Sequence, residues 1–183
     1  MSEEYVIQNS SPTLAGIKTG NLFTCAYESR ESLDLEVNAF NKRFAGKGIQ
    51  FVVLQYARRA LIYIFRRKKL TRDLAHPKAR QILAQRGYDT DDLDSCICHL
   101  KSRFAAYAAF PHEVGLFLGY PPEDVDGFIR YGGRNCKCFG CWKVYGNTEA
   151  ARQCFERFKH CTACYCEQYH KGCSLDALVV AQP

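Results

Sequence analysis

Two strand-like runs joined by a short turn most constrain how this chain can fold. Residues 49–56 (IQFVVLQY) and 60–65 (ALIYIF) are rich in β-branched and aromatic residues, and Ala57-Arg58-Arg59 separates them. Such residues fit the pleated surface of a sheet. A connection of about three residues joins antiparallel neighbours. The sequence therefore predicts a β-hairpin, and with it an antiparallel sheet.

Helical patterns surround this hairpin. Periodic apolar residues, opening prolines and closing glycines predict helices on both sides of it. The predicted helices cover residues 29–46, 77–86, 89–109, 121–131 and 148–171. The run VGLFLGY predicts a buried strand at 112–120, and residues 139–145 are predicted to form a further strand.

The two ends of the chain are predicted to be less regular. Residues 1–28 contain a proline, glycines and small polar residues, which indicates an irregular segment packed on the body. Residues 175–180 are predicted to form a short strand or a packed tail. The complete order predicts a single α+β domain over residues 1–183, with a mainly antiparallel sheet of about four to five strands covered by helices.

Composition indicates a cytoplasmic protein with reduced thiols. The N-terminus MSEEYVIQNSSP lacks the apolar run of a signal peptide, and no apolar stretch approaches the ~20 residues of a membrane span. The chain has eleven cysteines, an odd number that cannot pair completely. Its net charge of +6 is modest, and no aromatic residues interleave with the basic run RRKKLTR. These features predict no membrane partner and disfavour nucleic acid.

Three phrases of the sequence carry a resemblance to a known family. They are SPTLAGIKTGNLFTC, FPHEVGLFLGYPPEDVDGFI and CWKVYG. With them the chain resembles a family of uncharacterised proteins from anaerobic Firmicutes that has only a domain-of-unknown-function label. The resemblance covers nearly the whole chain and implies no established activity. The genes beside some members imply iron or redox metabolism and a flavodoxin-like redox partner.

Two close pairs of cysteines predict a metal site. Cys138 and Cys141 form one pair, Cys161 and Cys164 form the other, and 19 residues separate the pairs. Zinc and iron bind about four thiolate or imidazole ligands, commonly delivered as close pairs from two segments. The alternatives are that these cysteines are small buried or surface residues without a ligand, or that they form a disulfide or redox pair.

A second hypothesis makes the protein a cysteine-dependent enzyme. Cys25 precedes a predicted helix whose N-terminus would lower the pKa of its thiol. His112 would act as the base, and Glu113, Asp124 or Asn135 would orient its imidazole. The alternative is that His112 only bonds polar backbone at a strand entry.

A third hypothesis is a flat cofactor such as flavin or haem. Tyr131, Trp142 and Tyr145 would stack on it, and Arg134 follows a Gly-Gly pair that offers backbone N–H groups. The glycine-rich nucleotide loops GxGxxG and GxxxxGK[ST] are absent from the sequence. The alternative is that these aromatic residues form part of the core.

The leading interpretation is a metal- or redox-cofactor-linked protein that uses zinc or iron. The alternatives are the cysteine-dependent enzyme acting on a small molecule, and a protein-interaction domain without a catalytic site.

Overall fold

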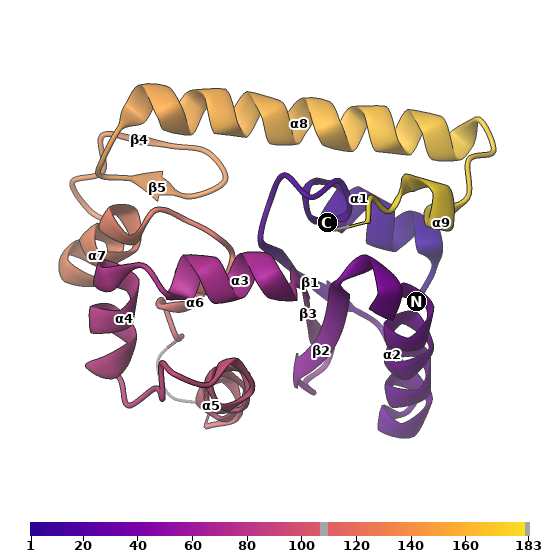
Figure 1. Ribbon diagram of the computed structural model, residues 1–183, viewed down its shortest axis with the longest axis horizontal. Coiled ribbons are helices and arrows are strands. Elements are labelled where there is room, and N and C mark those ends of the chain that lie inside the picture. The colour runs from indigo at the N-terminus through magenta and orange to yellow at the C-terminus, as the bar shows by residue number, and fades with distance from the viewer. Residues whose placement is uncertain (107–109, 182–183) are drawn as a thin grey trace. The chain divides into compact units, whose positions relative to one another are not determined.

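The computed structural model describes residues 1–106 and 110–181 (Figure 1). The chain divides into two compact units, which we call unit 1 (Met1–Lys69 with Phe158–Pro183) and unit 2 (Leu70–Arg157). In chain order the elements are α1 (Glu3–Leu14), β1 (Gly20–Cys25), α2 (Arg30–Phe44), the 3-10 helix η1 (Ala45–Lys47), β2 (Ile49–Gln55), β3 (Ala60–Arg66), α3 (Arg67–Leu74), α4 (Pro77–Ala84), α5 (Leu93–Ala105), α6 (Val114–Phe117), α7 (Pro122–Tyr131), β4 (Cys138–Phe139), β5 (Lys143–Val144), α8 (Thr148–His170) and α9 (Leu175–Leu178).

Unit 1 is built on the predicted hairpin. Strands β2 and β3 pair antiparallel, with Phe51 opposite Ile64 and Val53 opposite Ile62. Strand β1 adds to the other edge of β3, also antiparallel, so the order is β1-β3-β2. The predictions of an α+β class and of an antiparallel sheet are confirmed.

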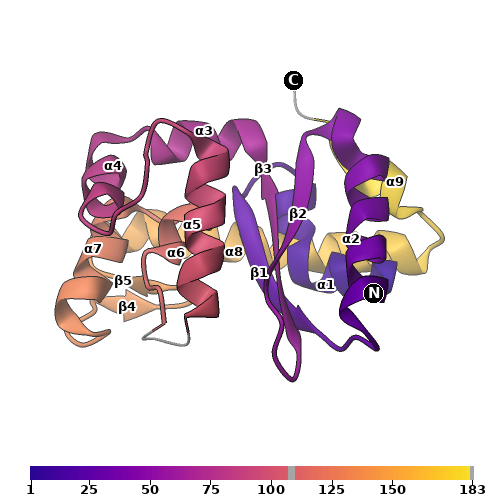
Figure 2. The same cartoon turned by 90° about the horizontal axis from the view of Figure 1, so that it is seen from below.

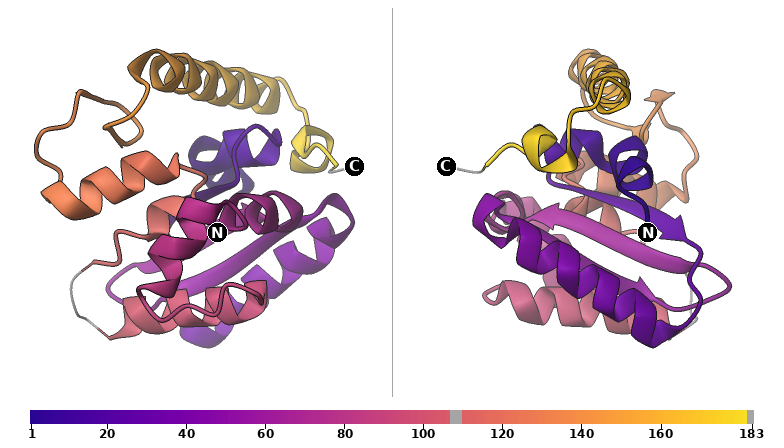
Figure 3. Two further views of the ribbon diagram at one scale, coloured as in Figure 1. Left: turned by 60° about the vertical axis from the view of Figure 1, so that its left-hand side comes forward. Right: turned by 90° about the vertical axis from the view of Figure 1, so that its right-hand side faces the viewer.

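One face of this sheet carries the core of unit 1. Residues at alternate positions along the three strands join one buried cluster with side chains from α1, α2 and α9. Figure 2 shows these three helices on the same side of the sheet, and Figure 3 shows α2 running alongside the strands. Alternation places every second strand residue on one face, which explains why a single face collects these apolar side chains.

Unit 2 consists mostly of helices and contains a second, smaller sheet. Helix α5 buries Ile97, Leu100 and Phe104 on one face, as its periodicity predicts. Strands β4 and β5 form a two-stranded antiparallel hairpin. Residues 107–109, the end of the predicted helix 89–109, lie outside the described residues.

The sequence interpretation was wrong for the N-terminal segment. Residues 1–28 are not irregular but contain α1 and β1. The side chain of Ser2 caps α1 by accepting a bond from the N–H of Tyr5, and Pro12 lies within the helix near its C-terminal end. Small polar residues and this proline obscured the helix, because they favour turns when no tertiary contact is considered.

The predicted strand at 112–120 is also wrong, and so is the strand alternative for residues 175–180, whereas the packed alternative for 175–180 agrees with the burial of Leu175 and Leu178. Within residues 112–120 the structure has the short helix α6, followed by Gly119 with a positive φ of 76°. Within residues 175–180 it has helix α9. Short apolar runs fit a buried strand and a buried helix equally well, so periodicity alone does not separate them. The predicted strand 139–145 is replaced by the two-residue strands of the β4–β5 hairpin.

Candidate functional site

Two helices of unit 2 that begin with proline form the walls of a groove. Helix α4 has Pro77 in its first turn, and the His76 ring caps it by accepting a bond from the N–H of Lys78 at 3.2 Å. Helix α7 begins at Pro122 and ends at Tyr131, and Gly132, with a positive φ of 59°, caps its C-terminal end. Proline suits the first helical turn because the N–H it lacks would have no partner there. Helices α4 and α7 pack against each other.

The groove between them has a volume of about 410 Å³, which falls in the range of roughly 300–1,000 Å³ found for small-molecule sites. The residues that line it are Pro77, Lys78, Gln81, Ile82, Gln85, Asp126 and Arg130. The α4 residues share one side because they follow helical spacing, and Ile82 is the buried apolar member of the set.

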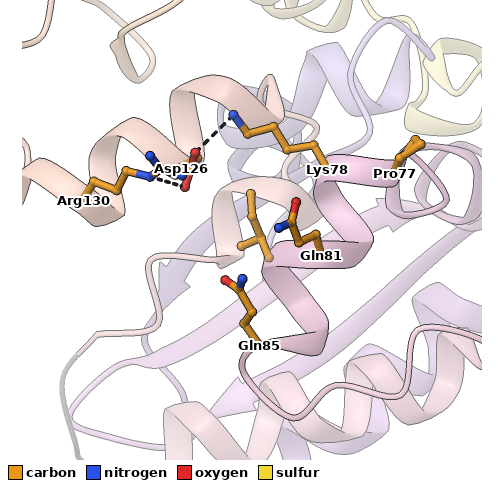
Figure 4. Close-up of a pocket in the computed structure, with 7 residues that line it drawn as sticks. Pro77, Lys78, Gln81, Gln85, Asp126 and Arg130 are labelled. Atoms are coloured by element: carbon orange, nitrogen blue, oxygen red, sulfur yellow. Dashed lines mark hydrogen bonds and ion pairs between the residues drawn. The ribbon is translucent and has the colours of Figure 1, made fainter.

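Asp126 lies between two cations in this groove, which we call the α4–α7 groove (Figure 4). One carboxylate oxygen is 3.1 Å from Lys78 Nζ, and the other accepts a hydrogen bond from Arg130 Nε at 2.9 Å. Burial tends to raise the pKa of Asp126, but the bonds from Lys78 and Arg130 outweigh it and hold that pKa below its usual value. The carboxylate is therefore ionised at neutral pH.

The groove also carries polar groups that are not used internally. The amides of Gln81 and Gln85 extend from α4 on the groove side (Figure 4). For these amides and for the two Nη groups of Arg130, the described part of the chain provides no hydrogen-bond partner. Donors therefore exceed acceptors along this surface, and the charged groups sum to one positive charge.

The aromatic residues predicted to hold a cofactor lie together in unit 2, around the buried Asp124. Its carboxylate accepts bonds from Trp142 Nε1 and from the N–H groups of Tyr145 and Gly146, each at 2.7 Å. The Trp142 ring stacks on that of Tyr120, with 4.7 Å between the ring centres. The Phe155 ring contacts it edge-on, with 4.5 Å between the ring centres. The neighbours of Trp142 thus occupy much of its surface.

The other two predicted cofactor residues are more exposed. Tyr131 is 50% exposed, and its ring stacks on that of Tyr145 with 5.8 Å between the ring centres. The hydroxyl of Tyr145 donates to the Arg134 carbonyl at 2.9 Å, and the Arg134 side chain is exposed. The four residues are neighbours, but flavin or haem binding stays a prediction.

Glu113 is buried and belongs to an ionic cluster of unit 2. One of its oxygens accepts bonds from the Tyr88 hydroxyl and from Arg103 Nε, both at 3.1 Å, and Arg86 lies 3.7 Å from the other. His112 is exposed, and its ring centre lies 5.5 Å from that of Phe110 and 4.7 Å from that of Phe128. The bonds of Glu113 connect it to α5 and to the segment after α4.

Cys25 is in unit 1, whereas His112 and Glu113 are in unit 2. The Cys25 thiol is only 4% exposed at the end of β1. Burial raises its pKa, although the N-terminal ammonium and Arg59 act in the opposite direction. A thiolate nucleophile needs a lowered pKa, so this environment does not favour the enzyme hypothesis.

The four predicted metal ligands also divide between the units. Cys138 and Cys141 lie in the β4–β5 hairpin and its loop, in unit 2, and Cys161 and Cys164 lie on the unit 1 part of α8. All eleven cysteines lie among the described residues, and none of them forms a disulfide. Among the described residues, no group of three or more His, Cys, Asp or Glu side chains is arranged to hold a metal ion.

The sequence interpretation missed the groove. A signal was present, because Lys78, Gln81 and Gln85 share a helical face and Asp126 and Arg130 are four residues apart. That two polar faces meet depends on how α4 packs on α7, which no local pattern specifies.

In residues 1–106 and 110–181 no helix has the length and apolar character needed to cross a membrane.

The fold and the groove define an α+β protein with a polar surface site of small-ligand size. The chain belongs to the family whose model is described as "Protein of unknown function (DUF3793)", which matches residues 6–179. The predicted membership of a family that has only a domain-of-unknown-function label is thereby confirmed. No curated protein and no solved structure matches the chain at a significant level.

Proposed function

We propose that the protein binds a small anion rich in oxygen atoms in the α4–α7 groove. The observation that carries this proposal is the Lys78–Asp126–Arg130 arrangement, which leaves one net positive charge and several free donors. Arginine suits a planar carboxylate or phosphate group because its donors form a fixed fork.

The free groups of the site specify the ligand further. The outer nitrogens of Arg130 would donate to the acidic group, and Lys78 would add a second cationic donor. The amides of Gln81 and Gln85 can each donate and accept, which suits hydroxyl groups on the same ligand. Ile82 offers an apolar floor for a short carbon chain.

Calorimetric titration with three probes tests this proposal. We expect glycolate or inorganic phosphate to bind and neutral glycerol not to bind. Replacing Arg130 with Gln should weaken binding by about 10- to 100-fold, the loss expected for a charge-assisted hydrogen bond. The control variant is Arg152→Gln on α8, also an exposed arginine of unit 2, which should bind like the wild type. Equal weakening in both variants, or binding of no anionic probe, would contradict the proposal.

We also propose, as a second candidate, a metal- or redox-linked role for the cysteines. Its support is the spacing of the Cys138–Cys141 and Cys161–Cys164 pairs and their free thiol state. Elemental analysis of protein purified without oxygen tests the role. About one zinc or iron ion per chain supports it, and metal-free, colourless protein contradicts it.

A further inference from the structure

Two cysteines of α8 are neighbours on one helix face. Cys161 and Cys164 are three residues apart within the continuous helix Thr148–His170. Side chains at this spacing have Cβ atoms about 5–6 Å apart. Cys161 is partly buried, and Cys164 is exposed to solvent. The pair therefore combines one sheltered thiol with one that is open to approach from solution.

The residues around this pair separate it from the other thiols of the helix. Tyr165, Cys166 and Tyr169 pack against the core of unit 1, so Cys166 belongs to a different side of α8. Burial raises the pKa of the Cys161 thiol to about 11, and the neighbouring Cys164 adds to this shift. The two thiols are therefore close enough to influence each other.

The spacing of the pair favours a bridging ion over a direct disulfide. A disulfide needs Cβ atoms about 3.5–4.5 Å apart, which is shorter than the helical separation of about 5–6 Å. An ion between the two sulfurs accommodates the wider spacing without distorting the helix. Zinc prefers about four ligands. Within the described chain no third His, Cys, Asp or Glu joins the pair in a metal-holding group.

We propose that Cys161 and Cys164 bind one Cu(I) ion as a two-coordinate dithiolate. Cu(I) is a soft cation that thiolates select, and it accepts two ligands. Both thiols lose their protons to solvent when the two copper–sulfur bonds form, and no electron is transferred. This inference is independent of the groove, because it concerns different residues in the other unit. It deepens the metal-linked role proposed for the cysteines and rests on it, since Cys161 and Cys164 are two of the four cysteines named there.

Competition titration tests the site in full-length protein purified without oxygen. Cu(I) is supplied as its bicinchoninate complex, and the protein competes with this chelator for the metal. The wild type should bind one equivalent tightly, with release of about two protons, because binding needs both thiols deprotonated. In the double variant Cys161→Ser/Cys164→Ser the affinity for this Cu(I) ion should fall at least about 100-fold. That loss exceeds the one typical of substitutions at outer-shell partners.

The matched control removes two other thiols, as Cys98→Ser/Cys136→Ser, and should keep the tight equivalent. Cys164→Ala alone should also lose it, and because Cys164 is exposed this change leaves the core intact. Circular dichroism verifies that each variant retains its helices. The proposal is overturned if the α8 variants bind as tightly as the wild type, or if the control loses the equivalent equally. Formation of an internal disulfide without copper binding would overturn it as well.

Discussion

Arg66 is the most deeply buried charged side chain among the described residues of unit 1, with 1% of its surface exposed. Its guanidinium donates to the backbone carbonyls of Thr13, Leu14 and Val180 at 2.6, 2.5 and 2.7 Å. Burial lowers its pKa, while Tyr165 acts in the opposite direction. The end of α1 and the C-terminal segment thus meet at one side chain that bonds carbonyls from both.

Replacing Arg66 with Met should lower the free energy of unfolding by about 3 kcal/mol or more, measured by urea denaturation. The Val180 carbonyl would lose its bond from Arg66, and the Thr13 and Leu14 carbonyls would each keep only a backbone donor. Losing such a buried bond costs about 1–3 kcal/mol. The control Arg58→Met, in the exposed turn before β3, should change stability by less than about 0.5 kcal/mol. If both variants lose the same stability, Arg66 does not hold these segments together.

The reactivity of the Cys25 thiol tests the hypothesis that this residue is an enzyme nucleophile. Because burial raises the pKa of Cys25, its alkylation in the native protein should be slow, and the exposed Cys98, Cys141 and Cys164 should react first. Mass spectrometry of iodoacetamide-treated protein measures the order. A fast reaction at Cys25 that slows in His112→Ala would support the nucleophile hypothesis and contradict this expectation.

Among the helices and strands, those with strong local sequence signals could be predicted, and those with weak signals could not. The hairpin 49–65 and helices α2 and α7 could be predicted because turn residues, prolines and glycines agree with the apolar pattern. Helix α6 could not, because VGLFLGY is apolar throughout and its conformation depends on burial from several sides. Helix α1 was missed because Ser10, Ser11 and Thr13 are polar but buried.

A substitution in helix α7 tests whether close packing outweighs the higher helix propensity of alanine. Gly127 lies in its interior, where alanine would favour the helix by about 1 kcal/mol. A Cβ at this position would lie 2.7 Å from Tyr145 Cδ2, and Tyr145 is held by its bonds to Asp124 and Arg134. We expect Gly127→Ala to lower the melting temperature, with a loss of about 1–3 kcal/mol.

The matched substitution is Gly46→Ala, where a Cβ would meet no atom within 4 Å. It should leave stability unchanged or raise it by up to about 1 kcal/mol, because alanine restricts the unfolded chain. If Gly127→Ala instead raises the melting temperature, then Tyr145 does not constrain α7 as described.

At the scale of the whole molecule, the sequence predicted the class of fold and the family but not the groove. The family model spans residues 6–179 and therefore parts of both units. The predicted catalytic and metal-ligating residues were chosen by type and spacing, and they divide between the units. The groove residues are ordinary surface lysine, glutamine, aspartate and arginine, which gain meaning only from the packing of α4 on α7.

Calorimetric titration of Asp126→Asn with glycolate and phosphate directly tests anion binding in the α4–α7 groove. This change removes the one negative charge of the α4–α7 groove and keeps the shape of the side chain. If an anion binds beside Lys78 and Arg130, its affinity should increase in the variant, because two cations then face it without a competing carboxylate. An unchanged or weaker affinity would contradict anion binding at this site.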